Sequence, residues 1–95
     1  MVSRTATIHN ESGVHARPAA VFVKMANRFP CEIFVEKDGQ RINGKSIMGL
    51  MMLAAGPGTT IVIEAKGKEA EAALAALREL VECGFVPAAP ASQQY

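Results

Sequence analysis

The first residues with the potential for chemistry are His15 and Arg17, in the stretch GVHARPAA. Pro18 suits the first turn of a helix, where a missing N–H costs nothing, and it biases Arg17 toward an extended conformation. We therefore expect His15 on an exposed loop just before a helix N-terminus, where unpaired N–H groups and the helix dipole favour an anion. Arg17 adds a permanent cation whose planar donors match phosphate oxygens. A neutral imidazole nitrogen beside such a site can accept a phosphoryl group and hold it covalently.

Residue types and spacing leave a second interpretation of this stretch open. No general base, metal cluster or deep pocket is indicated nearby, so His15 is equipped to carry a group rather than to act on a small substrate. On that view the protein is a carrier and not an enzyme. Alternatively, His15 only caps the helix and Arg17 is a solvated surface charge, because a short motif in one sequence does not separate the two.

Lys45 and Ser46 end a second stretch, GQRINGKS, which fits the phosphate-loop pattern of nucleotide-binding enzymes. Such an enzyme is built from βαβ units of about 30 residues each, which a chain of 95 residues cannot house in the required number. Asp38-Gly39 is also typical of a hairpin turn, which makes the following QRIN a strand rather than a backbone cradle. Ser46 then becomes the expected N-cap of a short helix.

The composition restricts the partners and the location of the protein. The net charge is only +1, with one Tyr and no Trp, so the sequence lacks the basic and aromatic signals of nucleic-acid binding. The N-terminus alternates in polarity without a long apolar run, so no signal peptide, membrane insertion or location other than the cytoplasm is expected. Cys31 and Cys83 lie far apart without metal-ligand spacing and are expected to be reduced thiols. We expect neither a metal nor a cofactor.

Hydrophobic periodicity predicts the element order β-α-β-β-α-β-α in one domain, residues 1–85, followed by a flexible tail, residues 86–95. Four strands and three helices in this order favour a two-layer α/β sandwich, with one sheet and all helices on one face. Gly84 is expected just after the last helix, at its C′ position. The expected strands are Val2 to His9, about 31–36, Gln40 to Asn43 and Thr60 to Lys66, and the expected helices are Ala16 to Phe29, Ser46 to Leu53 and Glu69 to Cys83.

The helix after Ser46 is apolar around most of its circumference. Its large side chains are Ile47, Met48, Leu50, Met51 and Met52, which cannot all point inward from so short a helix. About half of them are expected in the core, and the others form an exposed apolar patch. We expect Met48 and Met51 on the exposed side, with Ile47 at its margin.

The stretches NESGVHARPAA and GKSIMGLMML resemble the active-site and regulatory segments of HPr, the histidine-containing phosphocarrier family of the phosphoenolpyruvate-dependent phosphotransferase system. The resemblance covers about Val2 to Phe85 and implies an antiparallel sheet in the order 1-4-2-3. It implies that Nδ1 of His15 accepts a phosphoryl group from enzyme I and passes it to a IIA component. Arg17 and the backbone N–H groups of Ala16 and Arg17 would stabilise that group.

The resemblance also implies regulation and docking. In many relatives a serine matching Ser46 is phosphorylated by an ATP-dependent HPr kinase/phosphorylase. The helix that contains Ile47, Met48 and Met51 would help to form the docking surface for enzyme I and IIA partners. Two branches of the family remain open, the sugar-transport carrier and the nitrogen-related paralogue NPr, in which the protein would serve mainly as a regulatory binding protein. We expect a monomer.

Overall fold

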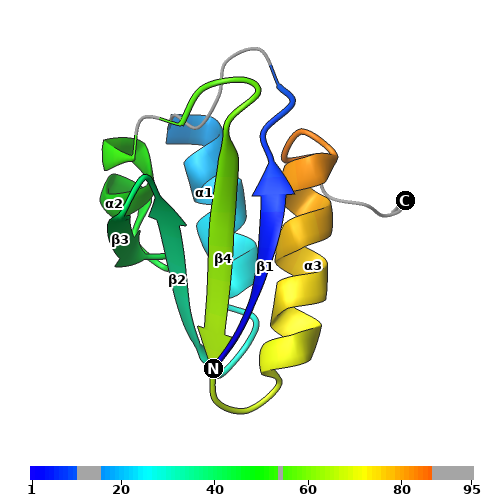
Figure 1. The fold of residues 1–95 in the computed structure, drawn as a ribbon. Coiled ribbons are helices and arrows are strands. Elements are labelled where there is room, and N and C mark those ends of the chain that lie inside the picture. Colours follow the sequence, from blue (N-terminus) through cyan, green and yellow to red (C-terminus); the bar gives the residue numbers. More distant parts are fainter. Residues whose placement is uncertain (11–15, 54, 87–95) are drawn as a thin grey trace, which may run out of the picture.

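The computed structural model describes residues 1–10, 16–53 and 55–86. The predicted order β-α-β-β-α-β-α is confirmed (Figure 1). Apart from Val86, the predicted tail lies outside the described residues, so the boundary between domain and tail stays a prediction. The elements are β1 (Val2–Thr7), α1 (Ala16–Ala26), β2 (Glu32–Lys37), β3 (Gln40–Asn43), α2 (Ile47–Met52), β4 (Thr60–Lys66) and α3 (Ala70–Glu82).

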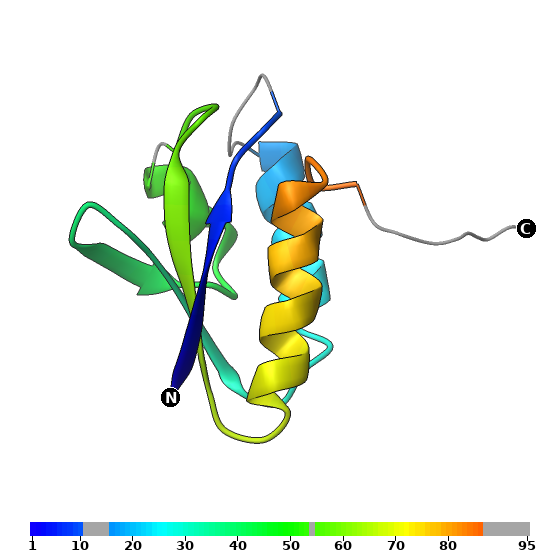
Figure 2. The ribbon, with the colours of Figure 1, turned by 45° about the vertical axis from the view of Figure 1, so that its right-hand side comes forward.

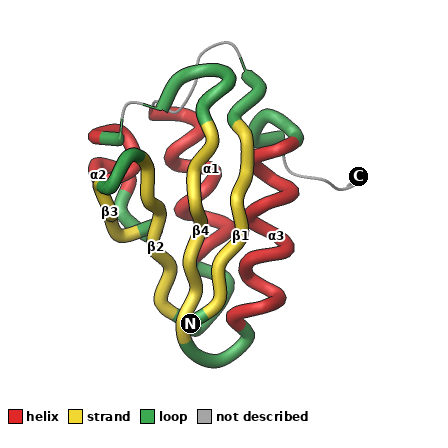
Figure 3. The backbone as a smooth tube through the Cα atoms, viewed as in Figure 1, coloured by secondary structure: helices red, strands yellow, loops and turns green. Residues whose placement is uncertain are grey.

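The four strands form one antiparallel sheet in the order β1-β4-β2-β3, as the resemblance implies (Figure 3). β4 lies between β1 and β2, with Thr5 opposite Val62 on one side and Val35 opposite Ile63 on the other. β3 pairs only with β2, through a hairpin. β1 and β3 are therefore the edge strands of the sheet.

The core lies between the sheet and the helices, and the predicted two-layer arrangement is confirmed. α1 and α3 run side by side along one face of the sheet, and α2 packs against α1 (Figure 2). Alternate strand residues point into this layer, as the period-2 pattern of a half-buried strand requires. The largest fully buried side chains are Phe22, Ile8, Ile33, Ile63, Leu74, Leu77, Val35 and Val81.

Local backbone chemistry explains the turns. Asp38 and Gly39 both have positive φ, 51° and 82°, as a two-residue hairpin turn requires. At the end of α3, Gly84 donates its N–H to the carbonyl of Val81, and Phe85 donates its N–H to the carbonyl of Leu80. This pair of bonds, with Gly84 at φ 75°, is the Schellman motif and confirms Gly84 as the C′ residue.

Two element ends differ from the prediction by more than one residue, and the ends of β2, α2 and α3 differ by one residue each. α1 ends at Ala26 rather than Phe29, because Arg28 and Phe29 bond to carbonyls three residues back in tighter turns before Pro30. β1 ends at Thr7 rather than His9. The ring of His9 is instead held by a side chain at the end of α3, described below.

Candidate functional site

The anion site is predicted at the start of α1. α1 begins at Ala16, and both Ala16 and Arg17 are exposed, while Pro18 and Ala19 are buried and fix the helix on the core. The first four N–H groups of a helix have no partner within it, and the first turn of α1 contains no acidic residue that would repel an anion. His15 itself lies outside the described residues, so its geometry and its role stay a prediction.

Ser46 is the N-cap of α2, as predicted. Its backbone is extended, with φ −115° and ψ 117°, and its Oγ accepts a hydrogen bond from the N–H of Gly49 at 3.0 Å. One of the unpaired donors of the first turn is thereby satisfied. The hydroxyl group that the resemblance marks for phosphorylation thus also has a structural task. Ser46 is half-buried, and the helix that follows it projects toward solvent.

The GQRINGKS stretch is not a free phosphate cradle. Gly39 closes the hairpin, and residues 40–43 form β3. A Cβ on Gly44 would meet Ile33 Cγ2 at 2.5 Å, so this glycine allows close backbone packing. The Lys45 ammonium donates to the carbonyl of Phe29 at 2.9 Å, which ties the start of α2 to the turn after α1. Each part of the pattern has a structural role.

α2 presents an exposed apolar patch made of Ile47, Met48, Met51 and Met52, with exposed fractions of 41%, 74%, 43% and 66%. The predicted exposure of Met48 and Met51 is confirmed. The expectation that about half of the helix's large side chains are buried is wrong, because Leu50 alone among them belongs to the core. The exposure of Met52 was not predicted, because a helix of six residues shows too little periodicity to assign each side chain to a face.

The candidate site elements lie near one another. α2 packs against α1, and it lies toward the end at which α1 begins (Figure 1). Exposed Arg17 and the apolar patch of α2 are thus parts of the same end of the molecule. This arrangement places the permanent cation of Arg17 and the exposed apolar side chains of α2 at one end of the molecule.

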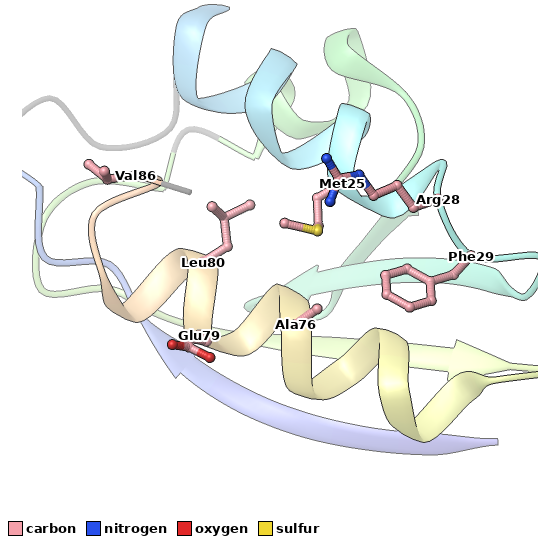
Figure 4. A pocket seen from close by; sticks show the side chains of 7 residues that line it. All are labelled: Met25, Arg28, Phe29, Ala76, Glu79, Leu80 and Val86. Atoms are coloured by element: carbon pink, nitrogen blue, oxygen red, sulfur yellow. The ribbon is translucent and has the colours of Figure 1, made fainter. Parts of the chain in front are cut away.

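A cleft elsewhere on the surface does not coincide with these residues. It has a volume of about 290 Å³ and lies between the C-terminal end of α1 and the middle of α3 (Figure 4). Its charged lining residues are Arg28 and Glu79. The lining residues are Met25, Arg28, Phe29, Ala76, Glu79, Leu80 and Val86, none of which was predicted to act.

Sites of other kinds are not found in the part of the chain that the structure describes. No group of three or more His, Cys, Asp or Glu side chains there could hold a metal ion. Among the same residues, none of the helices has the length and apolar character needed to cross a membrane. Cys31 is buried and Cys83 is exposed, and both are free thiols.

Comparison with known proteins agrees with this geometry. A family profile described as "PTS HPr component phosphorylation site" matches residues 2–83, nearly the whole chain. The chain belongs to the HPr family. An HPr-like protein Crh of Halalkalibacterium halodurans is 49% identical over 82 residues, which are 86% of this chain and 98% of that protein.

Solved HPr structures share the fold. The crystal structure of the phosphocarrier protein HPr of Bacillus anthracis is 50% identical, with a TM-score of 0.80 over 84% of this chain and 95% of that one. An HPr dimer of Thermoanaerobacter tengcongensis is 44% identical, with a TM-score of 0.71 over 90% and 99% of the two chains. The sheet order and helix arrangement described above are therefore those of an HPr phosphocarrier.

Proposed function

We propose that this chain accepts a phosphoryl group from phosphorylated enzyme I on Nδ1 of His15 and passes it to a IIA-type acceptor. The observation that carries the proposal is the exposed start of α1. The N–H groups of Ala16 and Arg17 and the Arg17 guanidinium directly follow His15 in the sequence, on a helix end without acidic residues. The chain acts as a carrier and not as an enzyme, because the covalent phosphohistidine is its working state.

One partner protein donates the phosphoryl group and the other accepts it, so the transfer reaction is balanced. The Nδ1 lone pair forms the new N–P bond while the bond between phosphorus and the donor breaks, and the bonding electrons stay with the donor. The reverse exchange delivers the group to the acceptor. Arg17 and the helix N-terminus offset the charge of the phosphoryl oxygens in the carrier state. No metal or cofactor is part of the proposal.

The docking surface in this proposal is the apolar patch of α2. Ile47, Met48 and Met51 were predicted for this role, and the 66% exposure of Met52 adds a fourth residue. Methionine side chains are flexible and polarizable, and they adapt to partners of different shape. One patch can therefore contact both enzyme I and a IIA component in turn.

Phosphorylation of Ser46 by an HPr kinase/phosphorylase is the proposed control of docking. A phosphoserine carries roughly −1.5 to −2 charges and, at a helix N-cap, interacts favourably with the helix dipole. The fold is then retained while the electrostatic potential beside the apolar patch changes. We expect partners to bind the modified protein more weakly.

Two labelling experiments test the two sites. With enzyme I and phosphoenolpyruvate, the protein should gain the mass of one phosphate that acid removes, and His15→Ala should abolish this gain. If His15→Ala still gains it, the site assignment is wrong. With HPr kinase/phosphorylase and ATP, an acid-stable phosphate should appear and should be absent from Ser46→Ala.

Arg17 has its own test, in the rate of phosphoryl transfer. A charge-assisted hydrogen bond contributes about 1.5–3 kcal/mol, so Arg17→Ala should slow transfer by roughly ten- to hundredfold. Arg17→Lys keeps the charge but loses the planar pair of donors, so its transfer rate should lie between those of the wild type and Arg17→Ala. Equal rates for all three proteins would remove Arg17 from the site.

The branch of the family is decided by the acceptor. We propose the sugar-transport carrier of the cytoplasm, because the GKSIMG segment keeps the pattern of kinase-regulated relatives. The alternative is an NPr-like regulatory binding protein, which the Gly84-Phe85 ending favours. Transfer from the phosphorylated protein to a sugar-type IIA acceptor supports the sugar-transport carrier. Transfer only to a nitrogen-type acceptor supports the NPr-like protein. We propose a monomer in either case, although solved relatives include dimers of both HPr and Crh.

A further inference from the structure

Glu82, the last residue of α3, holds two residues at the exit of β1, by which we mean residues 7–9. Its Oε2 accepts the N–H of Thr7 at 2.8 Å, and its Oε1 lies 2.8 Å from Nε2 of His9. The Thr7 N–H and the His9 ring both lower the pKa of Glu82, so its carboxylate is ionised at neutral pH. We call this arrangement the Glu82 clip.

The clip completes an anchor of which Ile8 is the other half. The side chain of Ile8 is fully buried in the core. Its N–H donates to the carbonyl of Thr59 at 2.9 Å, and its carbonyl accepts from the N–H of Gly58 at 2.7 Å. Ile8 is therefore fixed on the core and on the turn before β4, while the residues on either side of it are fixed on α3. Contacts on two sides hold the exit of β1 in one direction.

The Glu82 clip lies at the end of the molecule that contains the candidate site. The end of β1, the start of α1 and the end of α3 lie at the same end in both ribbon views (Figures 1 and 2). Along the chain, His9 is six residues before His15, and α1 begins directly after His15 at Ala16. Buried Pro18 and Ala19 hold the start of α1 on the core. The segment with His15 is thus connected to anchored residues on both sides.

Other polar contacts join α3 to β1 without reaching its exit. Arg4 Nη2 lies 3.2 Å from Oε1 of Glu71, which belongs to the first turn of α3. Further along α3, Arg78 Nε donates to the carbonyl of Thr5 at 3.0 Å. Glu71 and Glu82 are therefore two carboxylates of one helix that both bond residues of the first strand or its exit. Only Glu82 fixes the residues that lead to His15, so the two can be compared directly.

We propose that Glu82 is a positioning residue for phosphoryl transfer at His15 and that it acts through Thr7 and His9. The clip sets the direction in which the chain leaves β1, and the start of α1 sets the direction in which it re-enters the fold. Transfer requires the attacking nitrogen to meet the phosphorus in line, so small displacements slow it. Glu82 does not contact the phosphoryl group in this role. The inference rests on the function proposed above and adds a residue of α3 to it.

The test is the rate of phosphoryl transfer from phosphorylated enzyme I, with the concentration of this protein varied. We compare the wild type with Glu82→Ala and His9→Ala. The cost of ordering the backbone of one freed residue corresponds to a roughly five- to thirtyfold fall in the maximal rate for Glu82→Ala. His9→Ala keeps the Thr7 bond and should show a smaller fall. KM should be unchanged in both, because the proposed docking surface on α2 is intact.

Two further variants separate positioning from general stability. Glu82→Gln is the conservative rescue, because its amide oxygen accepts the Thr7 N–H and its amide nitrogen donates to the unprotonated Nε2 of His9. It should recover most of the wild-type rate. Glu71→Ala is the matched control and should transfer at the wild-type rate. Far-UV circular dichroism checks that each variant is folded.

Amide hydrogen exchange gives a readout that does not require transfer. The N–H of Thr7 should exchange faster in Glu82→Ala than in the wild type, and Glu71→Ala should leave it unchanged. Because the His9 side chain is more than half exposed, His9→Ala is expected to fold and carries the kinetic test if Glu82→Ala unfolds.

The kinetic outcomes separate this inference from the proposed function. A wild type that gains no phosphate on His15 contradicts the proposed function itself. If the wild type is phosphorylated and Glu82→Ala transfers equally fast, the positioning role is wrong while the proposed function stands. Equal losses in Glu82→Ala and Glu71→Ala would assign the effect to the general contact between α3 and β1 and would also overturn the positioning role.

Discussion

The N-cap of α2 gives the sharpest prediction, because one side-chain atom has a structural and a proposed regulatory task. Ser46→Ala removes the single hydrogen bond from the Gly49 N–H to Ser46 Oγ. Loss of an N-cap side chain costs about 0.5–2 kcal/mol, typically about 1 kcal/mol. In a domain of 60–100 residues, a change of 1 kcal/mol lowers the melting temperature by roughly 4–8 °C. We expect that shift for Ser46→Ala.

Matched caps separate the structural task of Ser46 from its charge. Asparagine and aspartate cap helices about as well as serine, so Ser46→Asn and Ser46→Asp should both unfold within about 0.5 kcal/mol of the wild type. Urea and thermal unfolding followed by circular dichroism measure all four proteins. If Ser46→Asn loses as much stability as Ser46→Ala, the hydrogen bond is not the cause. An unchanged Ser46→Ala would refute the cap altogether.

The same variants then report on docking. Ser46→Asp and Ser46→Asn differ by one charge at a position beside the exposed patch of α2. If charge regulates docking, enzyme I should bind Ser46→Asp more weakly than Ser46→Asn in isothermal titration calorimetry, and Ser46→Asn should match the wild type. The difference should shrink at high salt, because salt screens exposed charges. Equal binding by the two variants would contradict charge-based control.

Three further predictions concern stability. Gly44→Ala should cost about 1–3 kcal/mol in denaturant unfolding, because the new Cβ would lie 2.5 Å from Ile33 Cγ2. Glu69 has φ 65°, so Glu69→Gly should be more stable than Glu69→Ala by about 1 kcal/mol. The pKa of Glu82 is lowered because its carboxylate accepts the Thr7 N–H and also bonds a histidine ring. The ionised Glu82 carboxylate therefore adds to the free energy of unfolding at pH values above the ordinary carboxylate pKa. This added stability is lost as the pH falls through the lower pKa of the folded state. The free energies of unfolding of Glu82→Gln and the wild type should therefore converge in acid.

The features predicted from sequence are those that a few neighbouring residues determine. The Asp38-Gly39 turn, the Ser46 cap and the Gly84 C′ position each depend on the backbone preferences of one or two residues. The β3 and β4 bounds match the prediction because turn residues and alternation mark both ends of each strand. Sheet order came only through the family resemblance, since pairing between distant strands is not encoded in local periodicity.

The features that sequence did not predict depend on residues distant along the chain. Arg78 and Glu82 have polar positions on an amphipathic helix, which ordinarily indicate a solvated face. Only the fold brings them to Thr5 and Thr7, more than seventy positions away. The bond from Lys45 to the carbonyl of Phe29 is of the same kind, because it requires α1 and α2 to pack together first.

The distribution of exposed apolar side chains supports one docking surface rather than several. The exposed large apolar residues of the described chain are Met1, Ile47, Met48, Met51, Met52 and Val86. Four of these six belong to α2, and the other two stand at the ends of the described chain. If α2 is the docking surface, as proposed above, each partner contacts the same helix, and donor and acceptor cannot occupy it together. That constraint suits a carrier, because the phosphorylated protein has to leave the donor before it can meet the acceptor.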